Sequence, residues 1–375
     1  MSGGPLSGIR VVEFAGIGPG PYVGQLLADM GAEVLVIERE RGKAPANPVN
    51  DRGKARWALD IRDPQGRDAA LDLLGRADVL VEGFRPGVME RLGLGPDVVR
   101  AANPRLIYGR MTGWGQDGPL AQTAGHDITY LAPTGALAAM GPAGEAPVPP
   151  LNLVGDFGGG ALFLAFGIAA ALVERATSGE GQVIDAAIVD GVASMMGFFA
   201  GFAATGLIPQ DRGRNMLGGA APFYRSYVCA DGRYLAVGAI EPAFLAELLA
   251  RLGAPADLMD GREDPANWPA QTQALAAIFA TRPRDEWAAL LEGGDACAAG
   301  VLALDEAPGH PHLAARGVYE TRDGVLHPAP APRFSRTPGA IRAAEDAAAV
   351  RARWAATPAI GPAAPTGYAR ASDSV

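Results

Sequence analysis

The sequence predicts an α/β protein with a large domain, built on a mainly parallel sheet, and a smaller α/β domain. Over residues 1–115, short apolar runs alternate with amphipathic segments, which is typical of parallel strands joined by helices. Near residue 223 the pattern changes to two alternating runs around an Asp-Gly pair, which favours an antiparallel hairpin. The length of 375 residues also indicates two or three domains.

The elements of the large domain are expected in strand–helix order. Asp63 and Pro64 supply an N-cap and a first helical residue. Gly31 ends an earlier helix, in which four apolar residues recur at the spacing of one helix face, namely Val23, Leu26, Leu27 and Met30. Strands are expected at Ile9–Phe14, Glu33–Ile37, Val79–Val81, Leu106–Met111 and Gln182–Ala187, and a long apolar helix at Phe157–Val173.

The smaller domain is expected to combine a hairpin with helices. The hairpin strands are Tyr224–Cys229 and Arg233–Gly238, and an apolar run follows at Ala298–Leu304. Helices are expected at Glu241–Leu252, Gln271–Thr281 and Arg284–Glu292. The proline-rich stretch Pro328–Pro338 predicts an extended connection. We therefore assign residues 1–190 with 328–375 to the large domain, 191–222 to linker helices and 223–327 to the small domain.

The charge of the chain limits its partners. Lys and Arg number 32 and Asp and Glu 41, so the net charge is −9, which argues against a nucleic-acid partner. An anionic ligand must then be held by local arginines or helix N-termini. The two cysteines, Cys229 and Cys297, form neither a disulfide framework nor a zinc pattern. We expect no metal, a reducing compartment and, with no signal-peptide pattern, a cytoplasmic protein.

One stretch is long and apolar enough to raise the question of a membrane. Gly191–Gln210 has no charged residue, but it contains several glycines and a proline and lacks flanking basic residues. We interpret it as a buried helix, for which a subunit interface is one candidate location, and we expect no membrane partner.

A glycine-rich turn after the first expected strand is similar to the dinucleotide-binding fingerprint. Gly16 and Gly18 match its first two glycines, and Glu38 ends the second expected strand, where an acidic residue usually binds the ribose. The third glycine position is Pro21, whose ring prevents the close helix–strand packing that glycine allows. The broken motif argues against NAD(P) binding.

Several blocks of sequence resemble the class III CoA-transferase superfamily over nearly the whole chain. They are Pro5–Glu13, Pro19–Pro21, Leu27–Ala32, Arg52–Lys54, Asn103–Tyr108 and Gly113–Pro119. Three further blocks, Ala124–Ile128, Leu151–Phe157 and Gly238–Pro242, resemble its α-methylacyl-CoA racemase branch. The resemblance implies a large Rossmann-like domain, a small α/β domain and an interlocked homodimer. It also implies an acyl-CoA substrate and no separate cofactor, because CoA is part of the substrate.

The resemblance places His126 and Asp156 as two bases that act on opposite faces of the carbon next to a thioester. One removes the α-proton to give an enolate, and the other returns a proton to the opposite face. Glu241 matches a position that supports the histidine. Backbone N–H groups near Asp127 and at the start of the Asp156 helix are candidates for stabilising the enolate oxygen.

The same resemblance suggests where CoA binds. Arg39 matches the family after the second strand, and nearby arginines are further candidates for the phosphates. The segments Leu59–Ile61 and Gly125–Tyr130 match those that line CoA in relatives. The complete predicted set is Arg39, Leu59, Asp60, Ile61, Arg62, Arg85, Arg91, Gly125, Asp127 and Tyr130. A pliable acyl pocket is one interpretation of Met195, Met196, Phe198, Phe199 and Met216, and an ordinary core is the other.

Taken by themselves, the residues leave alternatives open. His126 is either catalytic or structural, and Asp156 is either a helix N-cap or a base. Helix-terminus bonds would lower the pKa of Asp156, whereas burial would raise it. The first candidate function is therefore racemisation. The second is CoA transfer with Asp156 as nucleophile, and the third is a non-catalytic or NAD-binding protein. The Gly-His-Asp triplet favours the first.

Overall fold

The computed structural model describes residues 3–40 and 47–356. The chain divides into two units. The first unit comprises residues 1–131, 151–194 and 317–375, and the second comprises 132–150 and 195–316. This division differs from the expected bounds in three places. Residues 132–150 belong with the second unit, as do residues 195–222 of the expected linker, and the chain returns to the first unit at Gly317.

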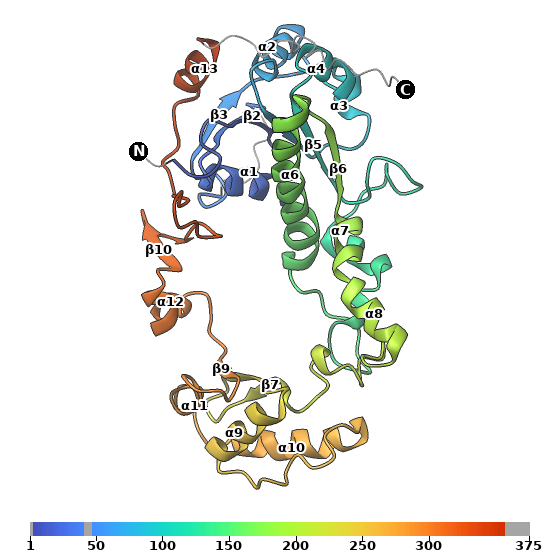
Figure 1. Cartoon of the computed structure of the whole chain (residues 1–375), viewed down its shortest axis with the longest axis vertical. Helices are drawn as coiled ribbons and strands as arrows, with labels where there is room; N and C mark the ends of the chain where they lie inside the picture. The colour runs from blue at the N-terminus through green and yellow to red at the C-terminus, as the bar shows by residue number, and fades with distance from the viewer. Residues whose placement is uncertain (1–2, 41–46, 357–375) are drawn as a thin grey trace, which may run out of the picture. The chain divides into compact units, whose positions relative to one another are not determined.

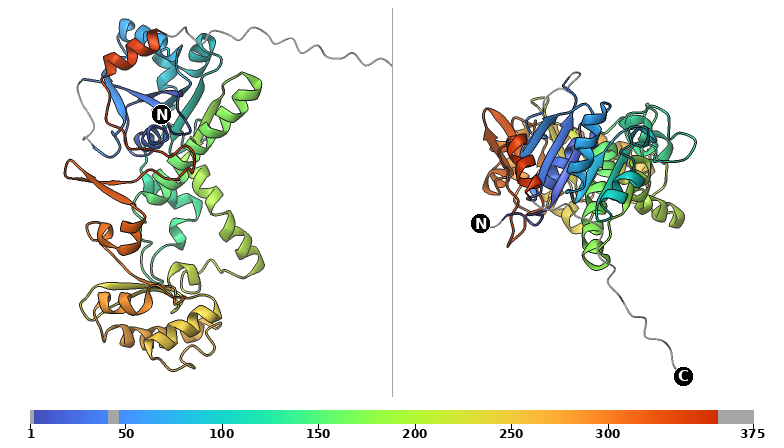
Figure 2. Two further views of the ribbon diagram at one scale, coloured as in Figure 1. Left: turned by 60° about the vertical axis from the view of Figure 1, so that its left-hand side comes forward. Right: turned by 90° about the horizontal axis from the view of Figure 1, so that it is seen from above.

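The first unit contains a six-stranded parallel sheet in the order β3-β2-β1-β4-β5-β6, which confirms the predicted fold class. The right-hand view of Figure 2 shows its strands side by side. Their bounds are β1 Arg10–Phe14, β2 Glu33–Glu38, β3 Lys54–Ala58, β4 Val79–Glu82, β5 Ile107–Thr112 and β6 Val183–Ala187. Strand β3 was not expected, because its sequence Lys-Ala-Arg-Trp-Ala has charged residues where an apolar strand was sought.

Helices of the first unit precede or follow the strands of this sheet. They are α1 Pro19–Asp29, α2 Pro64–Leu74, α3 Val88–Arg91, α4 Pro96–Ala102, α5 Asp127–Leu131, α6 Phe163–Ser178, α7 Ile188–Met195 and α13 Ala347–Ala355. Helices α1, α6 and α13 contact the sheet directly. Helix α6 runs beside β5 and β6 (Figure 1). It continues directly from a π-helix, η3 (Leu153–Leu162), so the helical segment is longer than the predicted Phe157–Val173. The core includes Val12, Leu35, Leu80, Tyr108 and Trp354.

The second unit has its own sheet and core. Its strands are β7 Tyr224–Val228, β8 Tyr234–Gly238 and β9 Ala298–Gly300, all antiparallel, and its main helices are α9 Pro242–Leu252, α10 Trp268–Phe279 and α11 Arg284–Leu291. The predicted hairpin is confirmed, since β7 pairs with β8 and Gly232 has a φ of 76° in the turn. Leu235, Leu248, Phe279 and Trp287 are among the buried residues of this core.

Shorter elements complete the described chain. They are η1 Ala132–Thr134, η2 Leu137–Ala139, α8 Gly197–Thr205, η4 Met216–Gly218, η5 Pro265–Asn267, η6 Ala307–Gly309 and α12 Pro311–Ala315 in the second unit. The hairpin of β10 (Tyr319–Arg322) and β11 (Val325–Pro328) belongs to the first unit. The proline-rich stretch after β11 forms no helix, as expected.

The expectation of a single helix over Gly191–Gln210 is wrong, and most of the stretch is not buried within the chain itself. The stretch contains the end of α7 and all of α8, and no residue of α8 is buried. A segment that is apolar all round gives no periodic signal of which face is covered. By length and composition alone, two helical segments, Leu153–Ser178 and Ile188–Thr205, could cross a membrane. Core helices of soluble proteins pass the same test, so it assigns no membrane.

Candidate active site

A cavity of about 630 Å³ lies at the carboxyl ends of β1, β4 and β5 in the first unit. Strands β2 and β3 lie on one side of β1, whereas β4, β5 and β6, which follow in the sequence, lie on its other side. This change of direction opens a crevice at the strand ends, where α/β proteins bind ligands. Residues of Phe14–Gly20, Val81–Pro86 and Met111–Trp114 form its walls.

His126 lines this cavity and immediately precedes α5. Its backbone is fixed by Thr129, whose Oγ1 accepts from the His126 N–H at 2.9 Å and donates to the His126 carbonyl at 2.7 Å. The residue is exposed, so its imidazole is accessible from the cavity. A short capped turn therefore presents a histidine at the cavity wall.

Asp156 lines the same cavity from a different segment of the chain. It lies in the first turn of η3, so the N-cap interpretation is wrong: the N-cap position is Asn152, whose Nδ2 donates to Asp156 Oδ2 at 3.4 Å. Burial, the largest effect, raises the pKa of the Asp156 carboxyl, and the neighbouring Asp127 raises it further. The bond from Asn152 and the proximity of His126 oppose this rise without cancelling it.

The turn between β1 and α1 approaches Asp156 closely. Gly18 has a φ of 68°, and a Cβ built on it would lie 3.0 Å from Asp156 Oδ2. One helical turn further, the ring of Tyr22 lies 4.8 Å from that of Phe157. Glycine at position 18 thus lets the backbone close one side of the carboxylate.

Two other predicted residues adjoin His126 and Asp156. Asp127 is not a lining residue, but its Oδ1 accepts the Asp156 N–H at 2.6 Å. Tyr130 lines the cavity, with its ring 5.0 Å from that of Trp114, and burial raises the pKa of its phenol. Gly113 and Gly125 make room for this ring, since a Cβ at either would lie within 2.5 Å of it.

The predicted CoA-binding residues separate into two groups. Arg85, Gly125 and Tyr130 line the cavity with His126 and Asp156. The others of the predicted set, apart from Asp127, do not line it: Arg39, Leu59, Asp60, Ile61, Arg62 and Arg91. Among them, the side chain of Ile61 belongs to the buried core.

Asp60 and Arg62 form an exposed pair. Their charged groups are 2.8 Å apart, and the bonds from Arg62 lower the pKa of Asp60 to about 2. A phosphate that bound Arg62 would therefore compete with this carboxylate.

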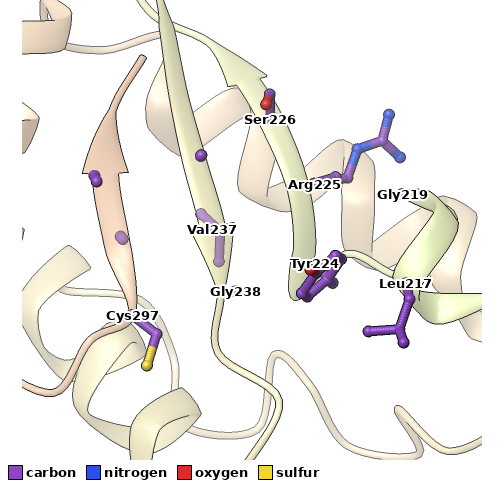
Figure 3. A pocket seen from close by; sticks show the side chains of 11 residues that line it. Leu217, Gly219, Tyr224, Arg225, Ser226, Val237, Gly238 and Cys297 are labelled. Carbon is purple, nitrogen blue, oxygen red and sulfur yellow. The ribbon is translucent and has the colours of Figure 1, made fainter. Parts of the chain in front are cut away.

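Glu241 belongs to the second unit, where it is exposed and precedes α9 without a side-chain capping bond. This unit contains a cavity of about 790 Å³ on the β7–β9 sheet, shown in Figure 3. The side chains that line it include those of Tyr224, Arg225 and Cys297. Burial raises the pKa of the Cys297 thiol, which disfavours a thiolate nucleophile. The acid–base pair in the first unit is therefore the stronger candidate.

Sequence reasoning missed several lining residues, among them Gly18, Phe84, Thr112, Trp114 and Asn152. The signal that could have found most of them is positional, because Gly18, Phe84, Thr112 and Trp114 end or follow the strands β1, β4 and β5. Asn152 follows no strand and had no such signal. Within residues 3–40 and 47–356, no three His, Cys, Asp or Glu side chains are placed to hold a metal ion.

Known proteins are similar to this chain in both sequence and fold. Two relatives named alpha-methylacyl-CoA racemase match: that of Mus musculus is 46% identical over 342 residues (91% of this chain, 89% of its own), and that of Homo sapiens is 43% identical over 334 residues (89% and 87%). The crystal structure of a CAIB/BAIF family protein from Brucella suis superposes with a TM-score of 0.78 at 28% identity, covering 94% of this chain and all of that one. The profile of CoA-transferase family III matches residues 6–361, and the chain belongs to this family.

Proposed function

We propose that the protein is a racemase that inverts the α-carbon of 2-methylacyl-CoA thioesters. The observation that carries this proposal is that His126 and Asp156, from separate segments, line one cavity at the carboxyl ends of the sheet strands. The racemase names of relatives that match about nine-tenths of this chain support the reaction.

In the proposed reaction, one base removes the α-proton and the electron pair of the C–H bond moves into an enolate. The other group, protonated beforehand, donates its proton to the opposite face, so one C–H bond breaks and one forms. A general base works best when its pKa lies near the working pH, and the raised pKa of Asp156 moves it in that direction. The same shift lets the carboxyl hold a proton for donation.

The enolate oxygen needs a hydrogen-bond donor. The N–H of Asp127, at the start of α5, has no acceptor within its helix and is the best candidate. The N–H of Asp156 already bonds to the Asp127 carboxylate, so the start of η3 is a poorer one than expected. Support of His126 by Glu241 remains a proposal from the resemblance.

We propose that the CoA moiety is held by the predicted set of residues other than the side chain of Asp127, with Arg85 nearest the reaction because it alone among the predicted arginines lines the cavity. Arg39, Arg62 and Arg91, with Leu59, Asp60 and Ile61, would bind parts of CoA beyond it. CoA arrives as part of the substrate, and no separate cofactor is proposed.

A homodimer in the cytoplasm completes the proposal. Exposed apolar side chains follow one face of η3 and α6, namely Leu162, Phe166 and Val173, of which Phe166 is 74% exposed. Such a face favours a protein partner over water. Sedimentation of the purified protein tests the assembly.

The alternative is CoA transfer, which the family name keeps open. Asp156 would then attack the thioester carbonyl, form a mixed anhydride and release CoA. A raised pKa lowers the fraction of Asp156 that is ionised and thus able to attack. His126 in the same cavity also favours proton transfer.

The test uses one enantiomer of a 2-methylacyl-CoA in D₂O without an acceptor acid. Racemisation predicts deuterium at the α-carbon together with inversion, followed by NMR and chiral chromatography. Absence of exchange, with CoA transfer once a free carboxylic acid is added, would overturn the proposal in favour of the alternative.

Substitution of the two bases tests the mechanism. His126→Ala and Asp156→Ala should each lower inversion by about 100-fold or more, since each removes a general acid–base group. Circular dichroism should remain unchanged, because neither side chain is buried in the core. Full inversion by either variant would contradict the two-base assignment.

A further inference from the structure

The first turn of η3 lacks a conventional cap. The opening N–H groups of a helix need acceptors from outside it. Asn152, at the N-cap position, makes no side-chain bond to them and instead binds Asp156 Oδ2. The Asp127 carboxylate takes this place, because Oδ1 accepts the N–H of Asp156 at 2.6 Å and the carboxylate also bonds to the N–H of Gly155.

The close fit between the two segments requires glycine at position 155. A Cβ built on Gly155 would lie 2.2 Å from Asp127 Oδ1, well inside contact distance. Gly155 is buried, and the second oxygen of Asp127, Oδ2, is buried without a hydrogen-bond partner in the described residues. The carboxylate therefore faces the start of η3 and not the cavity.

Asp127 also adjoins the other base. It follows His126 directly in the chain, and the bonds between His126 and Thr129 hold the turn that carries both residues. A single side chain thus connects the segment that presents His126 with the segment that presents Asp156. We propose that the Asp127 carboxylate is a positioning residue, which holds the two proposed bases of the active site at a fixed separation.

This inference rests on the proposed function and replaces the expectation, taken from the resemblance, that Asp127 is one of the CoA-binding residues. It has an electrostatic consequence as well. Asp127 raises the pKa of Asp156, after burial, while His126 and Asn152 lower it. Glu82, Arg85 and Tyr130 are the other ionisable groups that line the cavity, and the turn before α1 presents the uncharged Gly18 to the carboxylate.

Two substitutions distinguish the role of Asp127 as a hydrogen-bond acceptor from the effect of its negative charge. Asp127→Asn keeps an acceptor oxygen for the N–H groups and removes the negative charge. It should retain most of the α-proton exchange, but the acid limb of its pH–rate profile should move to lower pH, because one effect that raises the pKa of Asp156 is lost. Asp127→Ala removes the acceptor, and kcat should fall on the order of 100-fold, as for small misplacements of a catalytic group. KM for the CoA ester should change little.

The matched control is Asp117→Asn, which removes an exposed carboxylate that does not line the cavity and should behave as wild type. A rise in KM without loss of kcat in Asp127→Ala would mean that the side chain binds CoA and would overturn the inference. So would wild-type kcat and pH profile in both Asp127 variants.

Amide hydrogen exchange supplies a readout that does not depend on activity. Exchange of residues 152–160 should accelerate in Asp127→Ala and remain near wild type in Asp127→Asn, because only alanine leaves the N–H groups of Gly155 and Asp156 without their acceptor. If wild type shows no α-proton exchange, the proposed function fails, and this measurement still decides whether Asp127 positions Asp156. Unchanged protection in both variants would refute the positioning role.

Discussion

At the scale of single residues, the surroundings of Asp156 decide its chemistry. Burial outweighs the bond from Asn152, so the pKa of the carboxyl rises. The folded protein then binds this proton more tightly than the unfolded chain does. The contribution of Asp156 therefore favours folding at low pH, and it weakens as the pH rises from the ordinary value of 3.8 through the raised pKa. The raised pKa of Asp156, which we propose to be a catalytic base, therefore lowers the stability of the folded protein at neutral pH.

Gly18 gives the residue-scale prediction. Gly18→Ala places a methyl group 3.0 Å from Asp156 Oδ2 and forces a side chain into a backbone with a φ of 68°. Stability should fall by about 1–3 kcal/mol, and kcat should fall as Asp156 shifts. Gly8→Ala is the control, because its φ of 88° imposes a similar backbone strain while a Cβ there meets nothing within 4 Å and the residue does not line the cavity. Urea denaturation and α-proton exchange measure both effects, and equal behaviour of the two variants would contradict the close approach.

At the scale of elements, a buried ion pair ties α1 to the sheet. Lys54 Nζ in β3 lies 2.8 Å from Glu13 Oε2 in β1 and donates to the Pro21 carbonyl in the first turn of α1 at 2.7 Å. Gly24 lets the helix pass over this pair, since a Cβ there would lie 1.8 Å from Glu13 Oε2. The close helix–strand approach that Pro21 prevents is thus made one turn later.

Lys54→Met should therefore be strongly destabilising. It leaves the carboxylate of Glu13 buried without its partner, which costs about 3–5 kcal/mol. Burial already raises the pKa of Glu13, so the loss should shrink as the pH falls and this carboxyl takes up a proton. Arg67→Met, which removes an exposed ion pair with Asp68, should change the free energy of unfolding by less than about 1 kcal/mol. Denaturant titrations at two pH values test both statements.

At the scale of the whole molecule, the chain forms two units with separate cores, and its described C-terminal part returns to the first. Arg52 connects this return to the first unit, because it pairs with Asp29 at 2.6 Å and donates to the Pro328 carbonyl at 2.8 Å. Trp354 of α13 is fully buried in the first core. Segments from both ends of the chain therefore support the sheet that carries the site.

Trp354→Ala should accordingly lower the free energy of unfolding of the first unit. Loss of a fully buried tryptophan costs about 3–5 kcal/mol. Phe334→Ala, in the same returning segment but with the side chain 40% exposed, should cost far less. Thermal unfolding followed by calorimetry compares them, and an unchanged melting temperature for Trp354→Ala would contradict the role of α13 in the core.

Local pattern was enough to predict most elements of the fold. The strands β1, β2, β4, β5 and β6 and the β7–β8 hairpin lie within a residue or two of their predicted places, because each has a strong apolar or turn signal. Strand β3 and the exposed helix α8 were misjudged, since charge in the one and uniform apolarity in the other hide which face is buried. His126 and Asp156 were predicted from resemblance, whereas Gly18 was marked only by a motif that belongs to another kind of site, and the contact of Asn152 with Asp156 depends on the fold of η3.

The α/β class, the turn chemistry and the family could be predicted from the amino-acid sequence alone, because they depend on residues close together in the chain. Only the tertiary structure decided that His126 and Asp156 line one cavity, that the pKa of Asp156 is raised, and that Asp127 caps η3. These properties depend on burial and on contacts between segments about 30 residues apart or more, as in the 29-residue separation of Asp127 and Asp156. Such contacts form only when the sheet and its helices pack together.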